Sequence, residues 1–314
     1  MTDIDLREST SLESQPIIVP NGNGLLEPAP ATSGKRRRFG GPTELRRLAI
    51  QLLFTFSVVC LGFLLFVGYL SAFPQKRAQS GLQRALATRL SLVRAYIGGK
   101  IPSGTPIARI DIPRLGLHQV VVEGTSADQL RKGPGHLSVT PLPGQPGNAV
   151  LAGHNVAFGG PFSGIDHLRP GAHVEVLTGQ GSFTYVVTGH QLVKSSDVNP
   201  FGATPDNRLT LVTAANLSAS NRWVVTAALS GDPQPAPTGR PTVLSSREGG
   251  LVGQHGVLPA LALWVEVLLL SAVGTVILYR MLPRWSSYLI TTPVVLAVLW
   301  LVFTNLARLL PATL

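Results

Sequence analysis

Three long apolar segments constrain what this chain of 314 residues can fold into. No Asp, Glu, Lys or Arg interrupts the run from Leu48 to Phe73. Two further apolar runs, Leu258–Tyr279 and about Tyr288–Ala307, lie near the other end. A helix of about 20 apolar residues is long enough to cross a bilayer. We therefore predict three transmembrane helices, at residues 45–73, 258–279 and 288–309.

The first apolar segment could also be a cleaved signal peptide. The apolar core of a signal peptide is shorter, and no small-x-small cleavage site follows this one. We therefore expect an uncleaved anchor, preceded by a disordered tail over residues 1–44 that is rich in Ser, Pro and Gly.

Basic residues beside the apolar segments predict their orientation. Lys35–Arg38 and Arg46–Arg47 precede the first segment, and Arg280 and Arg284 lie in the loop 280–287 between the other two. Positively charged flanks stay in the cytoplasm. The sequence thus predicts a multi-pass plasma-membrane protein with a cytoplasmic N-terminal tail. Everything between the first two helices, and the tail 310–314, would lie outside.

Two connecting segments have compositions of their own. In residues 74–100, Leu82, Leu86, Leu90, Val93 and Ile97 fall on one helical face and arginines on the other. This pattern predicts an amphipathic helix that ends at Gly98-Gly99. It would either pack as a stalk against the following domain or lie on anionic lipid headgroups. Residues 231–257 are rich in Pro, Gly and Ser and are predicted to be a linker.

Residues 101–230 change to short Val-, Ile- and Thr-rich runs separated by Gly and Pro turns. Such spacing is typical of an all-β barrel or sandwich. The predicted strands are Ile107–Ile112, Leu117–Val122, Asn148–His154, His173–Leu177, Phe183–Val187, Arg208–Thr213 and Arg222–Ala227.

Composition argues against several classes of site. The only cysteine, Cys60, lies in the first apolar run, so no disulfide can form within the chain and the thiol is a poor nucleophile there. The histidines other than His154 lack metal-ligand spacing and are interpreted as turn and surface residues. We expect no metal or other cofactor. The net charge is +10, and the basic residues are concentrated near the apolar segments. This distribution favours the lipid bilayer over nucleic acid as a partner.

Several motifs in the β region occur in an order that resembles the sortase family, most closely its class E. They are IDIPRLG at 110–116, VEG at 122–124, GPGH at 133–136, PGQPGN at 143–148, LAGHN at 151–155, FSGIDHL at 162–168 and TLVTA at 210–214, followed by Arg222. Sortases are membrane-anchored cysteine transpeptidases of Gram-positive cell surfaces. The resemblance implies an eight-stranded β-barrel whose active site lies at the ends of two neighbouring strands.

The resemblance also assigns site residues. In an active sortase a cysteine thiolate attacks the Thr–Gly bond of a sorting signal such as L-P-x-T-G, and an amine then releases the product. The matching positions are Ala214 for the cysteine, His154 for the general acid and base, and Arg222 for the cation beside the substrate carbonyl. Leu211, Thr213 and Ala214 would form the floor of the peptide groove.

Alanine at position 214 removes the nucleophile, because a methyl group can neither attack nor leave. Either the chain is a natural pseudoenzyme or the alanine was engineered to trap an inactive enzyme. Ala215 also departs from the active pattern, which favours the natural case. The nearby hydroxyls of Thr213, Ser218 and Ser220 are poor replacements, since serine needs a stronger base than a histidine placed for a thiolate.

Three functions therefore stay open. The chain could be a non-catalytic binder or regulator of cell-surface proteins or of an envelope enzyme, with a sorting-signal-like peptide or another membrane or envelope protein as partner. It could be a class E-like transpeptidase that lacks its cysteine here, or a scaffold in a membrane complex.

Two further features prompt hypotheses. Glu266 lies inside the second apolar segment and would pair with Asn305 or Arg308 of the third. Residues 310–314 read LPATL, which contains L-P-x-T, so this tail could occupy the domain's own groove.

Overall fold

The computed structural model describes residues 42–216, 220–245, 248, 255–310 and 313. Most of the predicted disordered tail, Ser218 and most of the tail 310–314 lie outside these residues. The chain divides into two units, residues 1–56 and 57–314. The described part of the first unit is the beginning of helix α1 (Pro42–Leu65), where Glu44 and Arg47 form an exposed ion pair at 3.6 Å.

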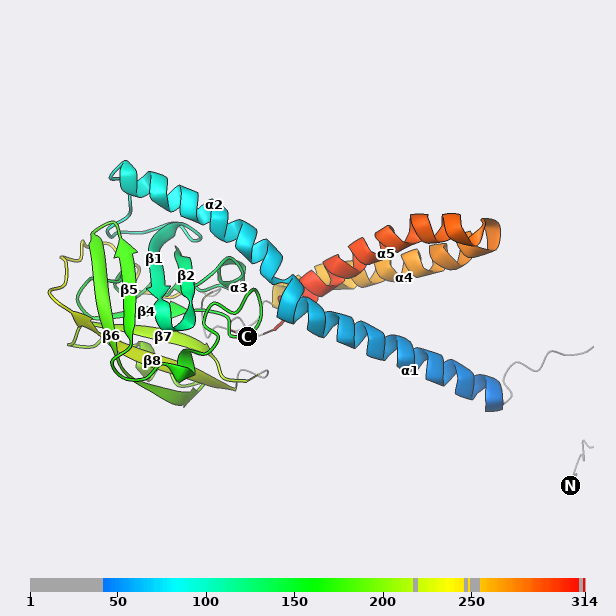
Figure 1. Cartoon of the computed structure of the whole chain (residues 1–314), viewed down its shortest axis with the longest axis horizontal. Helices are drawn as coiled ribbons and strands as arrows, with labels where there is room; N and C mark the ends of the chain where they lie inside the picture. Colours follow the sequence, from blue (N-terminus) through cyan, green and yellow to red (C-terminus); the bar gives the residue numbers. More distant parts are fainter. Residues whose placement is uncertain (1–41, 217–219, 246–247, 249–254, 311–312, 314) are drawn as a thin grey trace, which may run out of the picture. The chain divides into compact units, whose positions relative to one another are not determined.

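Eight strands close into a barrel in the order β1-β2-β3-β4-β7-β8-β6-β5 (Figure 1). This confirms the predicted all-β, eight-stranded barrel. The strands are β1 (Pro106–Ile112), β2 (Leu117–Glu123), β3 (Gly135–His136), β4 (Asn148–Ala152), β5 (His173–Thr178), β6 (Gly181–Lys194), β7 (Arg208–Ala214) and β8 (Asn221–Ser230).

The two faces of the strands account for two apolar clusters. Ala149 and Leu151 of β4 and Leu211 of β7 belong to the cluster that fills the barrel. Val150 and Val212 alternate with them and join a second cluster on the outer face. Because both faces are covered, residues 149–152 of β4 are all apolar, and in the parallel-paired β7 every residue from Leu209 to Ala214 is buried.

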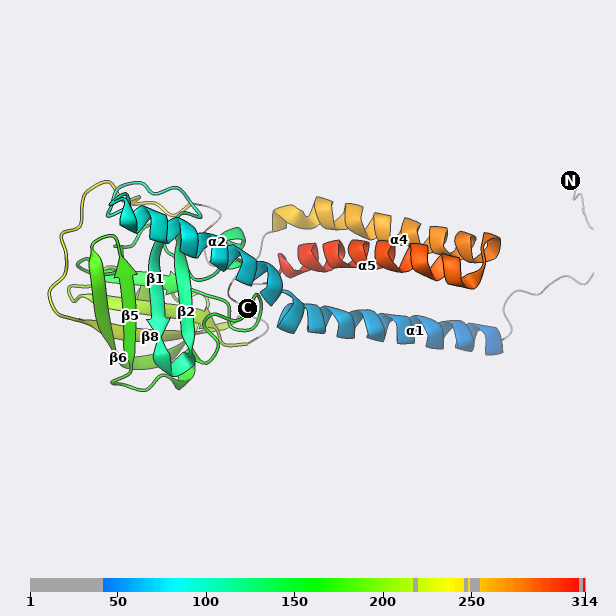
Figure 2. The same cartoon turned by 45° about the horizontal axis from the view of Figure 1, so that its top comes forward.

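Helix α2 (Ala72–Ser91) continues from α1 through the π-helical turn η1 (Phe66–Leu70) and lies along the barrel beside β1 and β2 (Figure 2). The Gln79 side chain bonds both backbone groups of Val120, accepting from its N–H at 2.8 Å and donating to its carbonyl at 3.0 Å. The amide therefore covers the edge of β2 as a neighbouring strand would. These contacts fit the stalk interpretation.

The structure ends this helix earlier than the sequence pattern suggests, at Ser91 rather than at Gly98. Leu92 closes the last turn, and Val93 takes a left-handed φ of 52°. Val93 is 91 % exposed, so it does not continue the apolar face of the helix to which the buried Leu86 belongs. The helical periodicity of Val93 and Ile97 is thus coincidental.

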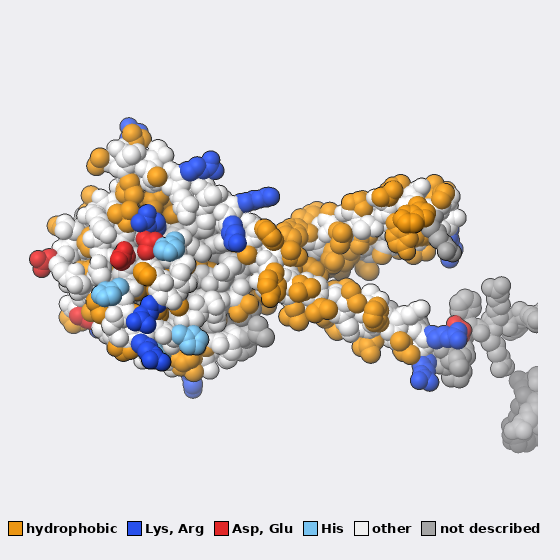
Figure 3. All heavy atoms as spheres, in the orientation of Figure 1, with side chains coloured by type: hydrophobic (Ala, Val, Ile, Leu, Met, Phe, Trp, Pro, Cys, Tyr) orange, Lys and Arg blue, Asp and Glu red, His pale blue; other side chains and the backbone are white. Residues whose placement is uncertain are grey.

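Helices α4 (Leu258–Met281) and α5 (Arg284–Ala307) pack against each other as a hairpin. Apolar side chains are exposed along both helices, among them Leu269, Leu270, Leu289 and Leu296, and they predominate on the face seen in Figure 3. Three helical stretches of the described chain are long and apolar enough to cross a membrane, namely Glu44–Ser91, Leu258–Met281 and Trp285–Ala307. Among the described residues, Glu266 does not form the predicted pair with Asn305 or Arg308. Glu266 is exposed, and the side-chain amide of Asn305 donates to Leu301 O at 2.8 Å instead.

A third apolar cluster joins the long apolar helices to the barrel. The centroid of the Phe66 ring lies 5.0 Å from the ring centroid of Trp300 and 5.8 Å from that of Phe303, both in α5. Ala157 and Phe158, from the loop after β4, complete the cluster. The Phe158 N–H also donates to Ser71 Oγ at 2.8 Å. The loop after β4 is therefore held directly by the helices.

Candidate functional site

The parallel pairing of β4 and β7 brings His154 next to Ala214. Ala152 is opposite Val212 in the register, so both strands end at the same edge. Beyond that point Gly153 N–H donates to Val212 O at 3.0 Å, and Thr213 Oγ1 donates to Gly153 O at 2.9 Å. These bonds hold the start of the His154 loop against the end of β7.

Gly153 is required for this close approach. A Cβ at this position would lie 2.7 Å from the ring of Phe162, closer than side chains tolerate. Phe162 also donates its N–H to His154 O at 3.0 Å. The glycine of the LAGHN motif thus lets the segment around Phe162 pack under the histidine.

Antiparallel pairing of β7 with β8 brings Arg222 opposite Ala214. Arg222 is 4 % exposed, and this burial lowers the pKa of its guanidinium. His154, Ala214 and Arg222 therefore come together at one edge of the barrel, although His154 is far in sequence from the other two.

His154 is buried as a neutral side chain. Burial, and then the charge of Arg131, lower its pKa to about 3. Its ring packs on Phe158 with 4.9 Å between centroids. Neither ring nitrogen has a hydrogen-bond partner among the described residues. A neutral imidazole keeps one donor and one acceptor, so this histidine is available to a ligand.

Arg131 and Asn155 are site residues that the sequence analysis missed. Arg131 follows the short helix α3 (Ala127–Leu130), and its guanidinium lies 5.9 Å from the Phe158 ring centroid. Burial, and then the charge of Arg308, lower the pKa of Arg131. The side-chain amide of Asn155 donates to Ala214 O at 2.9 Å. Asn155 ends the LAGHN motif, so its position was marked although its contact with Ala214 was not predicted, whereas no motif contains Arg131.

Leu211 and Thr213 lie elsewhere than predicted. Leu211 is fully buried inside the barrel, and Thr213 shares its face by strand alternation. Neither forms the floor of an outer groove. Thr213 instead positions the His154 loop through its bond to Gly153, whereas Ala214 lies on the outer-facing side with Val212.

An apolar cavity of about 210 Å³ lies on the outer face of the barrel, with Arg222 in its wall. Val150 and Ala152 of β4 line it, and Phe201 faces them from the loop after β6. Leu244 and Glu248, from the segment after the barrel, complete the wall. The Glu248 carboxylate accepts from Thr125 N–H at 3.0 Å and from Ser138 Oγ at 2.6 Å. The predicted linker therefore contributes to the groove.

His136 is not the turn or surface residue that the sequence suggests. Its side chain is fully buried, with Nδ1 3.0 Å from Glu123 Oε2 and Nε2 2.8 Å from Pro141 O. Arg240 completes the cluster from the segment after the barrel. The physical reason is that the carboxylate ending the apolar strand β2 needs buried polar partners.

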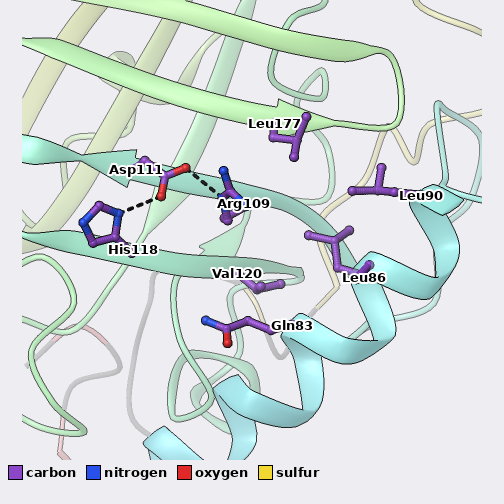
Figure 4. Close-up of a pocket in the computed structure, with 9 residues that line it drawn as sticks. Gln83, Leu86, Leu90, Arg109, Asp111, His118, Val120 and Leu177 are labelled. Carbon is purple, nitrogen blue, oxygen red and sulfur yellow. Dashed lines mark hydrogen bonds and ion pairs between the residues drawn. The ribbon is translucent and has the colours of Figure 1, made fainter.

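A larger cavity, of about 540 Å³, lies between α2 and strands β1 and β2 and includes none of these site residues. Leu86 and Leu90 line its helical side. Figure 4 shows Arg109 and His118 on either side of Asp111, each 2.8 Å from one of its carboxylate oxygens. These polar groups satisfy one another, so the chemistry at the β4 and β7 edge is the stronger candidate.

Comparison with known proteins identifies the domain that carries this edge. Residues 110–230 match the family model described as a sortase domain. The β domain belongs to the sortase family. The chain is 31% identical over 100 residues to Sortase D of Bacillus subtilis (strain 168), a match that covers 32% of this chain and 49% of the relative. It therefore spans about half the length of that curated relative.

Two solved sortase structures are also similar. One is a Clostridium perfringens Sortase D5 transpeptidase, with 28% identity, a TM-score of 0.43, and coverage of 50% of this chain and 98% of the other. The second is sortase E from Streptomyces avermitilis, with 36% identity, a TM-score of 0.39, and coverage of 42% and 91%.

Within this sortase domain, Ala214 occupies the end of β7 where the family motif has its cysteine. The sequence contains no other cysteine than Cys60, which lies in α1. The edge thus combines a buried neutral imidazole, two arginines and a methyl group.

Proposed function

We propose that this chain is a membrane-anchored, sortase-like protein that binds an extended peptide of the sorting-signal class and does not cleave it. One observation carries the proposal. Ala214 lies directly opposite Arg222, at the barrel edge that also carries His154, so binding groups are present without a cysteine nucleophile.

The chemistry of the groove supports a peptide ligand. The outer apolar cavity suits a leucine or proline side chain. Arg222 and His154 offer donors to a peptide carbonyl at the adjoining edge. Arg131 adds positive charge nearby, since its guanidinium lies 5.9 Å from the centroid of the Phe158 ring, which packs on His154. The groove therefore favours a neutral or anionic segment.

The apolar helices support a plasma-membrane location with the barrel outside. The basic residues before α1 and between α4 and α5 favour a cytoplasmic position for both. Such a protein would hold surface-protein precursors, or regulate an active sortase or another envelope enzyme.

The second candidate is a class E-like transpeptidase that attaches sorting-signal proteins to the cell wall, with its cysteine replaced by alanine here. The retained His154 and Arg222 favour it, because a binder needs no acid–base group. Ala215 argues against a transpeptidase, because active relatives often carry a polar or imidazole residue at this position.

Binding and turnover can be measured together on the full-length protein in nanodiscs. A fluorescent Leu-Pro-Ala-Thr-Gly peptide is titrated to millimolar concentration with triglycine as amine acceptor, and products are followed by mass spectrometry. We expect saturable binding without cleavage. Arg222→Ala should weaken binding about tenfold or more by removing charge-assisted hydrogen bonds, whereas Arg169→Ala, an exposed control, should not. Cleavage, or no binding to any form of the protein, would overturn the proposal.

A further inference from the structure

Of the residues after α5, the structure describes 308–310 and 313, and two of these, Leu310 and Thr313, contact the region around the ends of β4 and β7. Arg308 N–H donates to Asn305 O at 3.2 Å, and Leu309 N–H donates to Leu306 O at 3.0 Å, which completes the last turn of the helix. Leu310 packs against the apolar cluster that includes Phe158. This path points the chain at the His154 loop.

Thr313 is fully buried, and its carbonyl lies within the site. The oxygen accepts from Asn155 N–H at 3.0 Å and from Ala214 N–H at 3.4 Å. The first bond has ordinary length and the second is long. Two N–H groups from the ends of two neighbouring strands thus converge on one peptide carbonyl.

The position of that carbonyl matters chemically. It lies against the backbone of Ala214, the residue at the nucleophile position, and next to His154. Asn155 supports the arrangement a second way, since its side chain holds Ala214 O at 2.9 Å. Residues 310–313 read Leu-Pro-Ala-Thr, so the carbonyl in the site belongs to the threonine of an L-P-x-T sequence.

The segment after α5 approaches the site although two positive charges, on Arg308 and Arg131, repel each other there. Arg308 brings a cation close enough to Arg131 to lower its pKa. Both are positive, and no carboxylate other than Asp128, 4.0 Å from Arg131, pairs with them among the described residues. Backbone hydrogen bonds and the packing of Leu310 must therefore hold the segment.

We infer that Thr313, with Leu310 packed beside the site, is an internal ligand of the groove, a residue of this chain that occupies the site and excludes outside peptides. The inference rests on the proposed function, because it assumes that the groove binds peptides. An outside peptide would bind only after this segment leaves, so the protein would respond to whatever displaces it.

Because the internal segment is covalently attached to α5, its effective concentration at the groove determines how strongly it excludes an outside peptide. A segment joined by a short linker competes at an effective concentration in the millimolar range. For an outside peptide with a Kd of about 0.1 mM, and an equal intrinsic affinity of the internal segment, this weakens apparent binding about tenfold. The effect is large enough to measure by titration.

The experiment compares the full-length protein with a variant that lacks residues 311–314 and keeps Leu310, both in nanodiscs. The first readout is binding of the fluorescent Leu-Pro-Ala-Thr-Gly peptide. The second is deuterium exchange at Asn155 and Ala214, whose N–H groups would lose their acceptor. Val122 N–H, bonded to Pro134 O at 2.9 Å, is the internal reference for an intact barrel.

We expect about tenfold tighter peptide binding and faster exchange at Asn155 and Ala214 in the deletion variant, with Val122 unchanged. Equal peptide affinity in both proteins would overturn the internal ligand and leave the peptide groove standing. Unchanged exchange at Asn155 and Ala214 would overturn it even if no peptide bound. Faster exchange without peptide binding to either protein would support the internal ligand and refute the groove's role toward outside peptides.

Discussion

Arg240 and Glu123 meet in the barrel wall, with 2.8 Å between Arg240 Nη2 and Glu123 Oε1. The contact is an ion pair rather than an aligned hydrogen bond, since Glu123 Oε1 has no hydrogen-bond partner among the described residues, and Nη2 also donates to Ser138 O at 2.6 Å. The Glu123 side chain is 2 % exposed, so removing its cation would leave a buried charge. We predict that Arg240→Ala lowers the free energy of unfolding by about 3–5 kcal/mol, measured by urea denaturation.

The control for this prediction is Arg208→Ala, which breaks the exposed pair with Asp206. Exposed pairs contribute about 0–1 kcal/mol. If both substitutions cost the same, the Arg240 contact is not a structural anchor. Proteolysis would then also cut residues 231–245 equally fast in both variants, whereas we expect faster cleavage in Arg240→Ala alone.

Gly153 supports a second prediction. Its missing side chain leaves room for the Phe162 ring, which an added Cβ would meet at 2.7 Å. We expect Gly153→Ala to destabilise the protein by about 1–3 kcal/mol through overpacking and to disturb the His154 loop. The matched control is Gly189→Ala in β6, where nothing lies within 4 Å. Equal thermal unfolding of the two variants would contradict the packing argument.

His154 makes stability depend on pH in a defined direction. Its pKa is about 3 in the folded protein against an ordinary value of 6.5, so the unfolded chain binds the extra proton first. This contribution to stability is present above pH 6.5 and is lost as pH falls toward 3. The slope is at most about 1.4 kcal/mol per pH unit.

The measurement for His154 is denaturant unfolding at several pH values between these limits. His154→Asn should flatten the slope, because the substituted side chain does not titrate. His118→Asn is the control, since the His118 side chain is 66% exposed. An unchanged slope in His154→Asn would mean that this imidazole is accessible to water and protonated like the others.

The barrel was largely predictable because its strands carry their own signals. The runs at β4 and β7 are largely apolar, β7 contains the β-branched residues Thr210, Val212 and Thr213, and both runs follow turns that contain Pro, Gly or Asn. These features depend on neighbours in sequence. The same local logic missed the second half of β6, where side chains become exposed and polar and the register shifts between Val187 and Gly189.

The site was predictable only where family motifs mark it. His154, Ala214 and Arg222 fall in such motifs, and the barrel brings them together. Arg240 contacts Glu123 from far along the chain, inside a segment whose composition is typical of a linker. A local pattern holds no information about such a partner, because the contact depends on how a completed barrel surface binds a later segment.

The most direct prediction concerns the missing thiol. In Ala214→Cys, the sulfur would face the threonine carbonyl of a bound peptide. Attack would form an S–C bond and break the Thr–Gly C–N bond, with the thiol proton passing through His154 to the leaving amine. We expect an acyl-enzyme with Leu-Pro-Ala-Thr-Gly, visible by mass spectrometry, and more of it when residues 311–314 are also deleted.

The controls for the thiol separate chemistry from binding. Ala214→Ser should form no acyl-enzyme, because a neutral histidine placed for a thiolate is a weak base for serine. Adding His154→Ala to Ala214→Cys should slow acylation about 10²-fold or more by removing the proton carrier. If Ala214→Cys forms no acyl-enzyme with or without residues 311–314, the edge of β4 and β7 has lost more than its nucleophile. If the His154→Ala addition has no effect, the buried imidazole does not carry the proton.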